Sequence, residues 1–309
     1  MHIKEKHLQL LPTLQNALLA VAVFCYWMWI APHLLFYRES MQLFLWTEDY
    51  LSERLAVPGG FAQYLGECIV QLFLNPAIGA GCYALMAVMT KIISARLLSS
   101  VITDKVHWSW LTLLPPLVLW YITTVPTIPM TVPVALLLTI TLMAILPDNP
   151  RSSMWLTIVL VPTGYWLVGP AIGLLPLYHL RFLHRAQRFH IVTVVLGTLL
   201  LLAGSVVASR RVVAYPLRML VQGIDYHWAP ELMGDEEEMI YDMLSRRHRW
   251  ATIANRYNTH PSDNPAILAV AKFALYHEGM IERQELLQGL APSFRSQNSI
   301  PAMQMISEV

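Results

Sequence analysis

The sequence contains few charged residues. Asp, Glu, Lys and Arg make up 13% of its 309 residues, with 21 basic and 20 acidic side chains. A soluble domain carries about 25% charged residues. The shortage excludes a single soluble globular domain, a disordered chain and a nucleic-acid binder that relies on a basic surface.

Cysteine is also scarce, and several familiar motifs are missing. Cys25, Cys68 and Cys82 lie in or beside apolar stretches, without a Cys-x-x-Cys pair or a Cys/His metal spacing. This pattern excludes a disulfide framework and a zinc site, and predicts buried structural thiols. Phosphate loops, His-Glu-x-x-His and Gly-x-Ser-x-Gly are absent as well, so the commonest nucleotide and hydrolase signatures give no guidance.

Long apolar stretches are what the chain has in abundance. They recur at about 20 residues, the length that crosses a bilayer as a helix. We therefore predict an all-α, polytopic membrane protein with about seven transmembrane helices and a small helical outer domain. The predicted spans are residues 14–36, 76–97, 107–125, 129–147, 152–168, 170–184 and 190–209. Phe61–Leu74 is shorter and carries Glu67, so we expect it to be an interfacial helix in an outer loop, residues 37–75.

The distribution of Lys and Arg predicts the orientation. With a cytoplasmic N-terminus, nine basic residues fall on the inner side and Arg38 and Arg54 fall in the first outer loop, as the positive-inside rule requires. The nine are Lys4, Lys6, Lys91, Arg96, Lys105, Arg151, Arg181, Arg185 and Arg188. We expect a multi-pass protein of a bacterial inner membrane with a periplasmic C-terminal segment. Most tryptophans and tyrosines are expected in interfacial belts, and His33 and His179 at the membrane surface.

The composition changes near Arg210, which divides the chain into residues 1–209, the membrane domain, and residues 210–309, an extracytoplasmic helical domain. In the latter, Trp250, Ile253, Ala254 and Tyr257 follow the first-helix pattern of a tetratricopeptide repeat. The second helix then uses Ala266 and Val270, or Ala269 and Phe273 after a longer turn; a simple helical hairpin would give the same pattern. Because such repeats need about three units to be stable, we expect the natural chain to continue beyond Val309.

Two resemblances follow from the first outer loop and the architecture. The stretches 42–51 (QLFLWTEDYL) and 58–67 (PGGFAQYLGE) resemble a family of multi-span envelope proteins from Bacteroidota. That likeness covers the whole chain, implies a longer repeat-containing C-terminal half, and brings no activity. In architecture alone, the chain is similar to C-type-fold membrane glycosyltransferases. This second likeness implies transfer of a sugar from a polyprenyl-phosphate donor, with an acidic pair in the first outer loop acting as base or divalent metal ligand.

These expectations single out a small set of residues. Glu48 and Asp49 are the predicted catalytic pair, and the basic residues Arg210, Arg211 and Arg218 are predicted to bind a lipid phosphate. Glu67 and Arg54 are predicted to support them. The structural alternatives are a helix cap for Glu48-Asp49 and headgroup anchoring for the arginines.

Two functions remain open. The first is a C-type-like glycosyltransferase that acts on a polyprenyl-phosphate-linked sugar at the outer face of the membrane. The alternative is a non-enzymatic envelope scaffold that recruits a protein partner through its helical repeats. A transporter is disfavoured, because mid-membrane ionisable groups and repeated halves are missing from the sequence.

Overall fold

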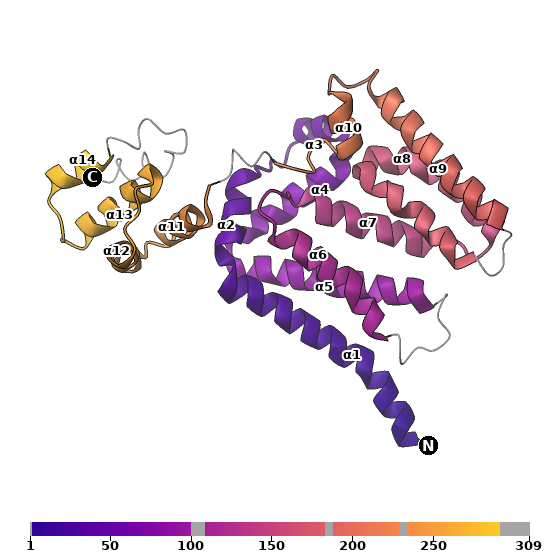
Figure 1. Cartoon of the computed structure of the whole chain (residues 1–309), viewed down its shortest axis with the longest axis horizontal. Helices are drawn as coiled ribbons and strands as arrows, with labels where there is room; N and C mark the ends of the chain where they lie inside the picture. Colours follow the sequence, from indigo (N-terminus) through magenta and orange to yellow (C-terminus); the bar gives the residue numbers. More distant parts are fainter. Residues whose placement is uncertain (1, 100–108, 183–187, 229–233, 291–309) are drawn as a thin grey trace. The chain divides into compact units, whose positions relative to one another are not determined.

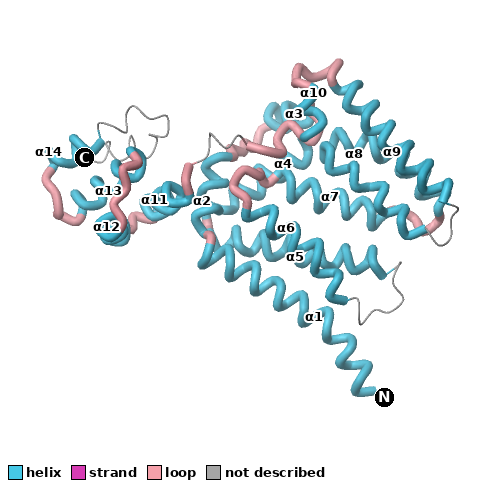
Figure 2. The backbone as a smooth tube through the Cα atoms, viewed as in Figure 1, coloured by secondary structure: helices cyan, strands magenta, loops and turns pink. Residues whose placement is uncertain are grey.

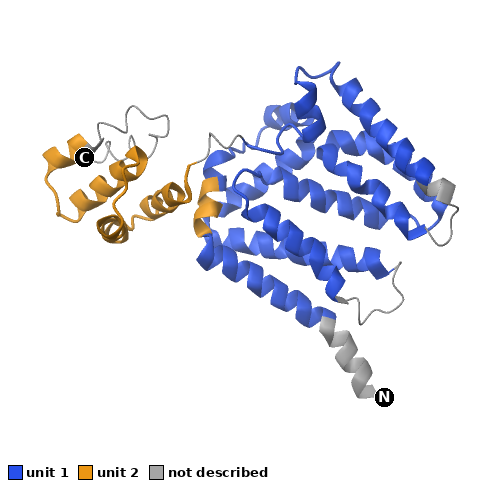
Figure 3. Ribbon diagram, viewed as in Figure 1, with its two compact units in different colours: residues 1–31, 38–230 blue, residues 32–37, 231–309 orange. Residues whose placement is uncertain are grey.

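The computed structural model describes residues 2–99, 109–182, 188–228 and 234–290. All regular structure in these residues is helical, without a strand, as Figure 2 shows. The chain forms two compact units (Figure 3): residues 1–31 with 38–230, and residues 32–37 with 231–309. The boundary between the two units thus lies after residue 230, about twenty residues beyond Arg210, where the composition changes.

The first unit holds the long apolar helices (Figure 1). Its elements are α1 (His2–Cys25), η1 (Tyr26–Ile30), α3 (Glu48–Leu55), α4 (Gly60–Val70), η2 (Gln71–Leu74), α5 (Pro76–Ser99), η3 (Ser109–Leu113), α6 (Leu114–Thr124), α7 (Thr131–Ile145), α8 (Pro150–Val168), η4 (Gly169–Phe182), α9 (Arg188–Ser209) and α10 (Leu217–Gln222). The helix α2 (Pro32–Met41) contributes residues to both units.

Four helical stretches in the described residues are long and apolar enough to cross a membrane. They are Pro12–Ile30, Pro76–Ser99, Pro150–Phe182 and Val192–Ser209. Two shorter apolar helices, Trp110–Thr124 and Thr131–Ile145, accompany them. The first stretch ends at Ile30 rather than at the predicted residue 36, because Ala31 leaves helical geometry (φ −123°, ψ 40°) and Pro32 begins α2.

The third of these stretches is folded back on itself at Gly169. This residue has φ +71° and ψ −153°, a conformation that only glycine adopts readily, and it ends α8. Beyond it η4 returns along α8, so that Thr157 Oγ1 and His179 Nε2 lie 2.9 Å apart although 22 residues separate them. His179 is fully buried by this pairing, which corrects the expectation of a headgroup contact.

Replacement of Gly169 with alanine should therefore destabilise the first unit by about 1–3 kcal/mol, since an L-residue is strained at this φ and ψ. The added methyl group would also meet the Tyr226 hydroxyl at 3.2 Å. The matched control is Gly204→Ala in α9, where the added methyl group meets nothing within 4 Å. Thermal unfolding in detergent should separate the two variants by several degrees, and equal unfolding temperatures would contradict this role of Gly169.

The helix expected to lie flat at the membrane surface is instead packed inside the protein. One face of α4 is buried, and α4 packs against both α7 and α8. The close approach depends on Gly66, where a methyl group would lie 2.9 Å from the backbone nitrogen of Thr131. The polar residue Glu67 of α4 pairs with Tyr50 and Arg54 of α3, in the same unit.

Arg38 fixes the chain where α6 ends. Its side chain is fully buried, and its guanidinium donates hydrogen bonds to the carbonyls of Ile128 (2.6 Å), Thr123 (2.8 Å) and Val125 (3.0 Å). Carbonyls at a helix C-terminus lack partners within the helix and carry partial negative charge, which a buried cation satisfies. Arg38, on α2, is thus a structural residue.

Aromatic residues follow the predicted interfacial belts only in part. Trp29, Trp110, Tyr121 and Trp155 are exposed, as belt residues are. Trp27 and Tyr165 are instead fully buried core residues, which corrects the expectation for them. The three cysteines are free and half-buried.

Besides its part of α2, the second unit has these helices among its described residues: α11 (Glu236–Arg246), α12 (Trp250–Thr259), α13 (Pro265–His277) and α14 (Arg283–Leu290). Their apolar faces share one core, in which Trp250 packs on Phe273 with ring centroids 5.0 Å apart. Ala269, Val270 and Phe273 are buried and Ala266 is half-buried, and it is the ring contact of Phe273 with Trp250 that turns the longer-turn pattern toward α12. Residues 291–309, including the helix expected near Val309, lie outside the described residues.

Candidate functional site

The predicted catalytic pair lies at the start of α3. Thr47 is the N-cap residue, and its hydroxyl accepts a hydrogen bond from the Tyr50 backbone N–H at 3.2 Å. Glu48 and Asp49 occupy the first turn, where negative charge is favourable, and both side chains are exposed. Their placement matches the helix-cap alternative, and a polar cluster begins one residue further along.

This cluster is built on Glu67, which is 4% exposed on α4. Its Oε2 accepts hydrogen bonds from Arg54 Nε (3.0 Å) and the Tyr50 hydroxyl (2.6 Å), and its Oε1 accepts one from Gln63 Nε2 (3.0 Å). The structure thus brings together Glu67 and Arg54, which the sequence assigned supporting roles. We call Tyr50, Arg54, Gln63 and Glu67 the carboxylate cluster.

Tyr50 couples this cluster to the loop before α3. Its hydroxyl lies 2.6 Å from the Leu43 carbonyl and 2.6 Å from Glu67, and it accepts a hydrogen bond from Arg54 Nη2 at 2.9 Å. A tyrosine has one proton to donate, so the two acceptors compete for it. Burial and the Glu67 carboxylate raise the pKa of Tyr50 to about 12. Tyr50 therefore stays a neutral donor at physiological pH.

Asp225 interacts electrostatically with two members of the carboxylate cluster, Glu67 and Arg54. It follows α10, and its Oδ2 accepts a hydrogen bond from Thr131 Oγ1 at 2.6 Å at the start of α7. Burial, and to a smaller extent the charge of Glu67, raise the pKa of Asp225 to about 6, against the lowering effects of Thr131 and Arg54. A carboxyl group with such a pKa exchanges protons near neutral pH.

The sequence analysis missed Asp225. The residue stands in the segment Gly-Ile-Asp-Tyr-His-Trp (223–228), where an aspartate between Gly223 and two aromatics resembles an ordinary turn. Two hydrogen bonds anchor this segment: the Tyr226 hydroxyl donates to the Val168 carbonyl, and the backbone N–H of Trp228 donates to the Thr127 carbonyl. The electrostatic interaction of Asp225 with Glu67 could not be predicted from the sequence, because the two residues lie far apart along the chain.

The raised pKa of Asp225 predicts a pH-dependent effect of Asp225→Asn. Because the folded-state pKa exceeds the usual 3.8, this group stabilises the fold fully below pH 3.8, and that contribution is lost as the pH rises through about 6. From about pH 4 to about pH 7, the wild type should lose on the order of 2 kcal/mol relative to the variant. Asp49→Asn, an exposed control, should show little such change in thermal unfolding. Parallel pH profiles of the wild type and Asp225→Asn would contradict the expectation.

The predicted phosphate-binding arginines are all on the surface. Arg210 and Arg211 stand in the turn that follows α9, and Arg218 lies on α10, where its Nε donates to Gln222 at 3.3 Å. Large apolar side chains are exposed on the same segment; they are Val212, Tyr215, Leu217, Met219 and Val221. Cations among exposed apolar groups are typical of a segment in the headgroup region of a membrane.

A second apolar surface adjoins the carboxylate cluster. Leu43, Leu45 and Trp46 are exposed in the loop before α3, whereas Phe44 between them is buried against Tyr50 and Tyr64. The Leu43 carbonyl is also the alternative acceptor of the Tyr50 proton. Groups that could contact lipid thus lie directly beside the buried carboxylate.

The described residues contain no group of three or more His, Cys, Asp or Glu side chains that could hold a metal ion. Glu48 and Asp49 alone would leave most positions of a divalent cation to water or substrate. The carboxylate of Glu67 is already occupied by Arg54, Tyr50 and Gln63, which are hydrogen-bond donors rather than metal ligands.

Four helical stretches in the described residues that are long and apolar enough to cross a membrane indicate an all-α protein of the membrane class. A family model matches residues 6–309, and the chain belongs to this family, described as "Family of unknown function (DUF6057)". Comparisons with curated proteins and with solved structures give no match.

Proposed function

We propose that this protein is a membrane enzyme that transfers a sugar from a polyprenyl-phosphate-linked donor to a hydroxyl group at the membrane surface. The observation that carries this proposal is the buried Asp225, which is held by Thr131 and whose pKa of about 6 suits general base catalysis. The proposal therefore moves the acid–base role from Glu48 and Asp49 to Asp225.

In the proposed reaction, the ionised Asp225 accepts the proton of the acceptor hydroxyl. The acceptor oxygen forms a bond to the anomeric carbon of the sugar, and the bond from that carbon to the phosphate oxygen breaks. The lipid phosphate leaves with the bonding electrons, and Arg210 and Arg211 offset its charge. Burial keeps part of Asp225 protonated near neutral pH, and Glu67, held by Arg54 and Tyr50, is a positioning residue whose charge adds to this effect.

The exposed apolar groups support a lipid substrate. The prenyl chain would lie along Leu43, Leu45 and Trp46 or along the exposed side of α10, with the phosphate at the level of the arginines. Both surfaces belong to the first unit, which also holds the carboxylate cluster. A soluble sugar nucleotide would have no use for these apolar side chains.

Native mass spectrometry of the purified protein with added polyprenyl phosphate tests the donor half of this proposal. We expect a bound adduct in the wild type and at least tenfold less in Arg210→Ala/Arg211→Ala. The control Arg96→Ala/Arg151→Ala removes two other exposed arginines and should keep the adduct. Equal binding by all three proteins would contradict the role of Arg210 and Arg211.

Complementation of a deletion strain tests the catalytic half. Asp225→Asn should abolish complementation while the protein remains folded in the membrane, whereas Glu48→Gln/Asp49→Asn should complement. If the reverse is found, the acidic pair of α3 is the catalytic one. If both variants complement fully, the protein is no such enzyme.

The proposal includes a topology of seven crossings with a cytoplasmic N-terminus in a bacterial inner membrane. It counts the two shorter helices as crossings and divides Pro150–Phe182 at Gly169. At about 1.5 Å per residue in α8 and about 2.0 Å in η4, each segment is about 28 Å long, close to the thickness of the hydrocarbon core. The hydrogen bond from the Tyr178 hydroxyl to the Leu146 carbonyl (2.7 Å) supports the alternation, because it joins the end of η4 to the end of α7.

The second candidate is a scaffold whose periplasmic, tetratricopeptide-like domain recruits a protein partner. It is favoured by the exposure of Met280 and Leu287, apolar residues beside and within α14 that another helical repeat would cover. A scaffold would keep its function in Asp225→Asn and lose it when the second unit is removed. The complementation experiment therefore separates the two candidates.

A further inference from the structure

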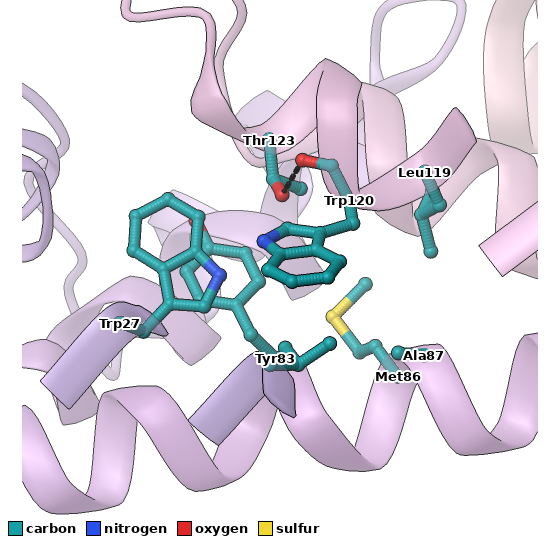
Figure 4. A pocket seen from close by; sticks show the side chains of 8 residues that line it. Trp27, Tyr83, Met86, Ala87, Leu119, Trp120 and Thr123 are labelled. Atoms are coloured by element: carbon teal, nitrogen blue, oxygen red, sulfur yellow. Dashed lines mark hydrogen bonds between the residues drawn. The ribbon is translucent and has the colours of Figure 1, made fainter. Parts of the chain in front are cut away.

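A small pocket opens between three apolar helices of the first unit, away from the carboxylate cluster. It is lined by Val23, Trp27, Tyr83, Met86, Ala87, Leu119, Trp120 and Thr123, from α1 with η1, α5 and α6 (Figure 4). Its cavity volume is about 10 Å³, room for one small polar atom such as a single oxygen. Trp27 belongs to the single π-helical turn η1 in the described chain, a departure from α-helical geometry that often marks a functional site.

Three hydrogen-bond donors on the pocket wall have no partner among the described residues. They are Trp27 Nε1, Trp120 Nε1 and the Tyr83 hydroxyl. Trp27 is 0% and Tyr83 3% exposed, and the two rings stack with centroids 4.3 Å apart. Figure 4 shows the indole nitrogens of Trp27 and Trp120 directed toward each other beside the Tyr83 ring. A buried donor without a partner costs about 1–3 kcal/mol, so three at one point indicate a missing acceptor.

The chemistry of the wall limits what the acceptor can be. An indole N–H donates only, so the ligand must present an oxygen to Trp27 and Trp120. The remaining lining includes Val23, Met86 and Leu119, which favours hydrocarbon next to that oxygen. The charge of Arg38 acts on Tyr83 and favours a ligand oxygen with partial negative charge.

The position of the pocket along the helices indicates where that oxygen comes from. Trp27 lies three residues before the end of η1, Tyr83 seven residues after the start of α5, and Trp120 four residues before the end of α6. At about 1.5 Å per residue, these places are about 5–10 Å inside the helix ends. If the helices cross a bilayer, this is the depth just below the headgroups, where the ester groups of lipids lie.

We propose that this pocket receives the carbonyl oxygen of the acyl-ester group of a membrane lipid, which accepts hydrogen bonds from Trp27 and Trp120, while the acyl chain leaves through the mouth of the pocket. The site is distinct from the carboxylate cluster and does not depend on the glycosyl-transfer proposal. It holds a structural or regulatory lipid between α1, α5 and α6.

Reconstitution in two matched lipids tests the site. Diester and diether phosphatidylethanolamine with the same chains differ in the presence of the ester carbonyl. The wild type should unfold about 5 °C higher in the diester lipid, since one or two hydrogen bonds are gained there. Trp27→Phe/Trp120→Phe should lose this difference, and the exposed control Trp29→Phe/Trp110→Phe should keep it.

Substitution of the two indoles could itself disrupt the core, so a second variant removes the N–H groups alone. Benzothienylalanine at positions 27 and 120 replaces each N–H with sulfur in a ring of the same shape, and should also lose the ester-dependent difference. An equal unfolding temperature of the wild type in both lipids would overturn the proposal and indicate an ordered water in the pocket. A difference that persists in the sulfur variant would overturn it as well.

Discussion

Arg38→Ala is expected to lower the free energy of unfolding of the first unit by about 4 kcal/mol. The substitution removes a fully buried side chain and leaves the carbonyls of Thr123, Val125 and Ile128 without their donor. Each lost hydrogen bond to a charged donor costs about 1.5–3 kcal/mol, and the vacated space adds to this where the structure does not collapse. The apparent unfolding temperature in detergent should fall by roughly 10 °C.

Two further variants define the origin of this effect. Arg38→Lys keeps the charge but concentrates its donors on one nitrogen, so it should recover only part of the stability. Arg211→Ala removes an exposed arginine and should change stability by less than about 0.5 kcal/mol. An Arg38→Ala variant as stable as Arg211→Ala would show that the end of α6 does not need this cation.

Glu67→Gln is expected to destabilise the first unit by about 3 kcal/mol. The amide keeps the shape of the side chain but removes the charge that pairs with Arg54 at 3.0 Å. It also replaces one carboxylate oxygen, which accepts hydrogen bonds, with an NH2 group, which donates them. Loss of one partner of a buried pair costs about 3–5 kcal/mol, and the partial exposure of Arg54 reduces that cost.

A double-mutant cycle isolates the pair. Arg54→Met and Glu67→Leu should each be strongly destabilising, and the double variant should be less destabilised than the sum of the two, with a coupling of about 1–3 kcal/mol. Strictly additive effects would mean that the two side chains do not interact in the folded protein. The Glu67→Leu variant of this cycle also tests the electrostatic effect of Glu67 on Asp225, because loss of the Glu67 charge should lower the pKa of Asp225.

The carboxylate cluster shows how far the sequence leads toward a site. Glu67 on an otherwise apolar segment was a visible anomaly in the sequence, and in the structure its carboxylate pairs with Arg54 at 3.0 Å. The partners Tyr50 and Asp225 were not visible, since they lie 17 and 158 residues away along the chain. No periodicity relates positions at such separations.

In the second unit, by contrast, the sequence predicted one buried helix face correctly but left the register of the next helix open. The stripe of Trp250, Ile253 and Ala254 was predicted from helical spacing, and all three side chains are buried. The spacing left two registers for the next helix. The packing of Phe273 on Trp250 selects one of them, because only one face of α13 can turn toward α12.

By itself the sequence determined the helical, membrane-type character of this chain, since apolar length and scarce charge are properties of composition and of local periodicity. Only the tertiary structure decided that α4 packs inside the protein, that the chain reverses at Gly169, and that Asp225 lies beside Glu67. Each of these depends on contacts between segments far apart in the chain. Such contacts are set by shape and by the pairing of buried polar groups, which no local pattern encodes.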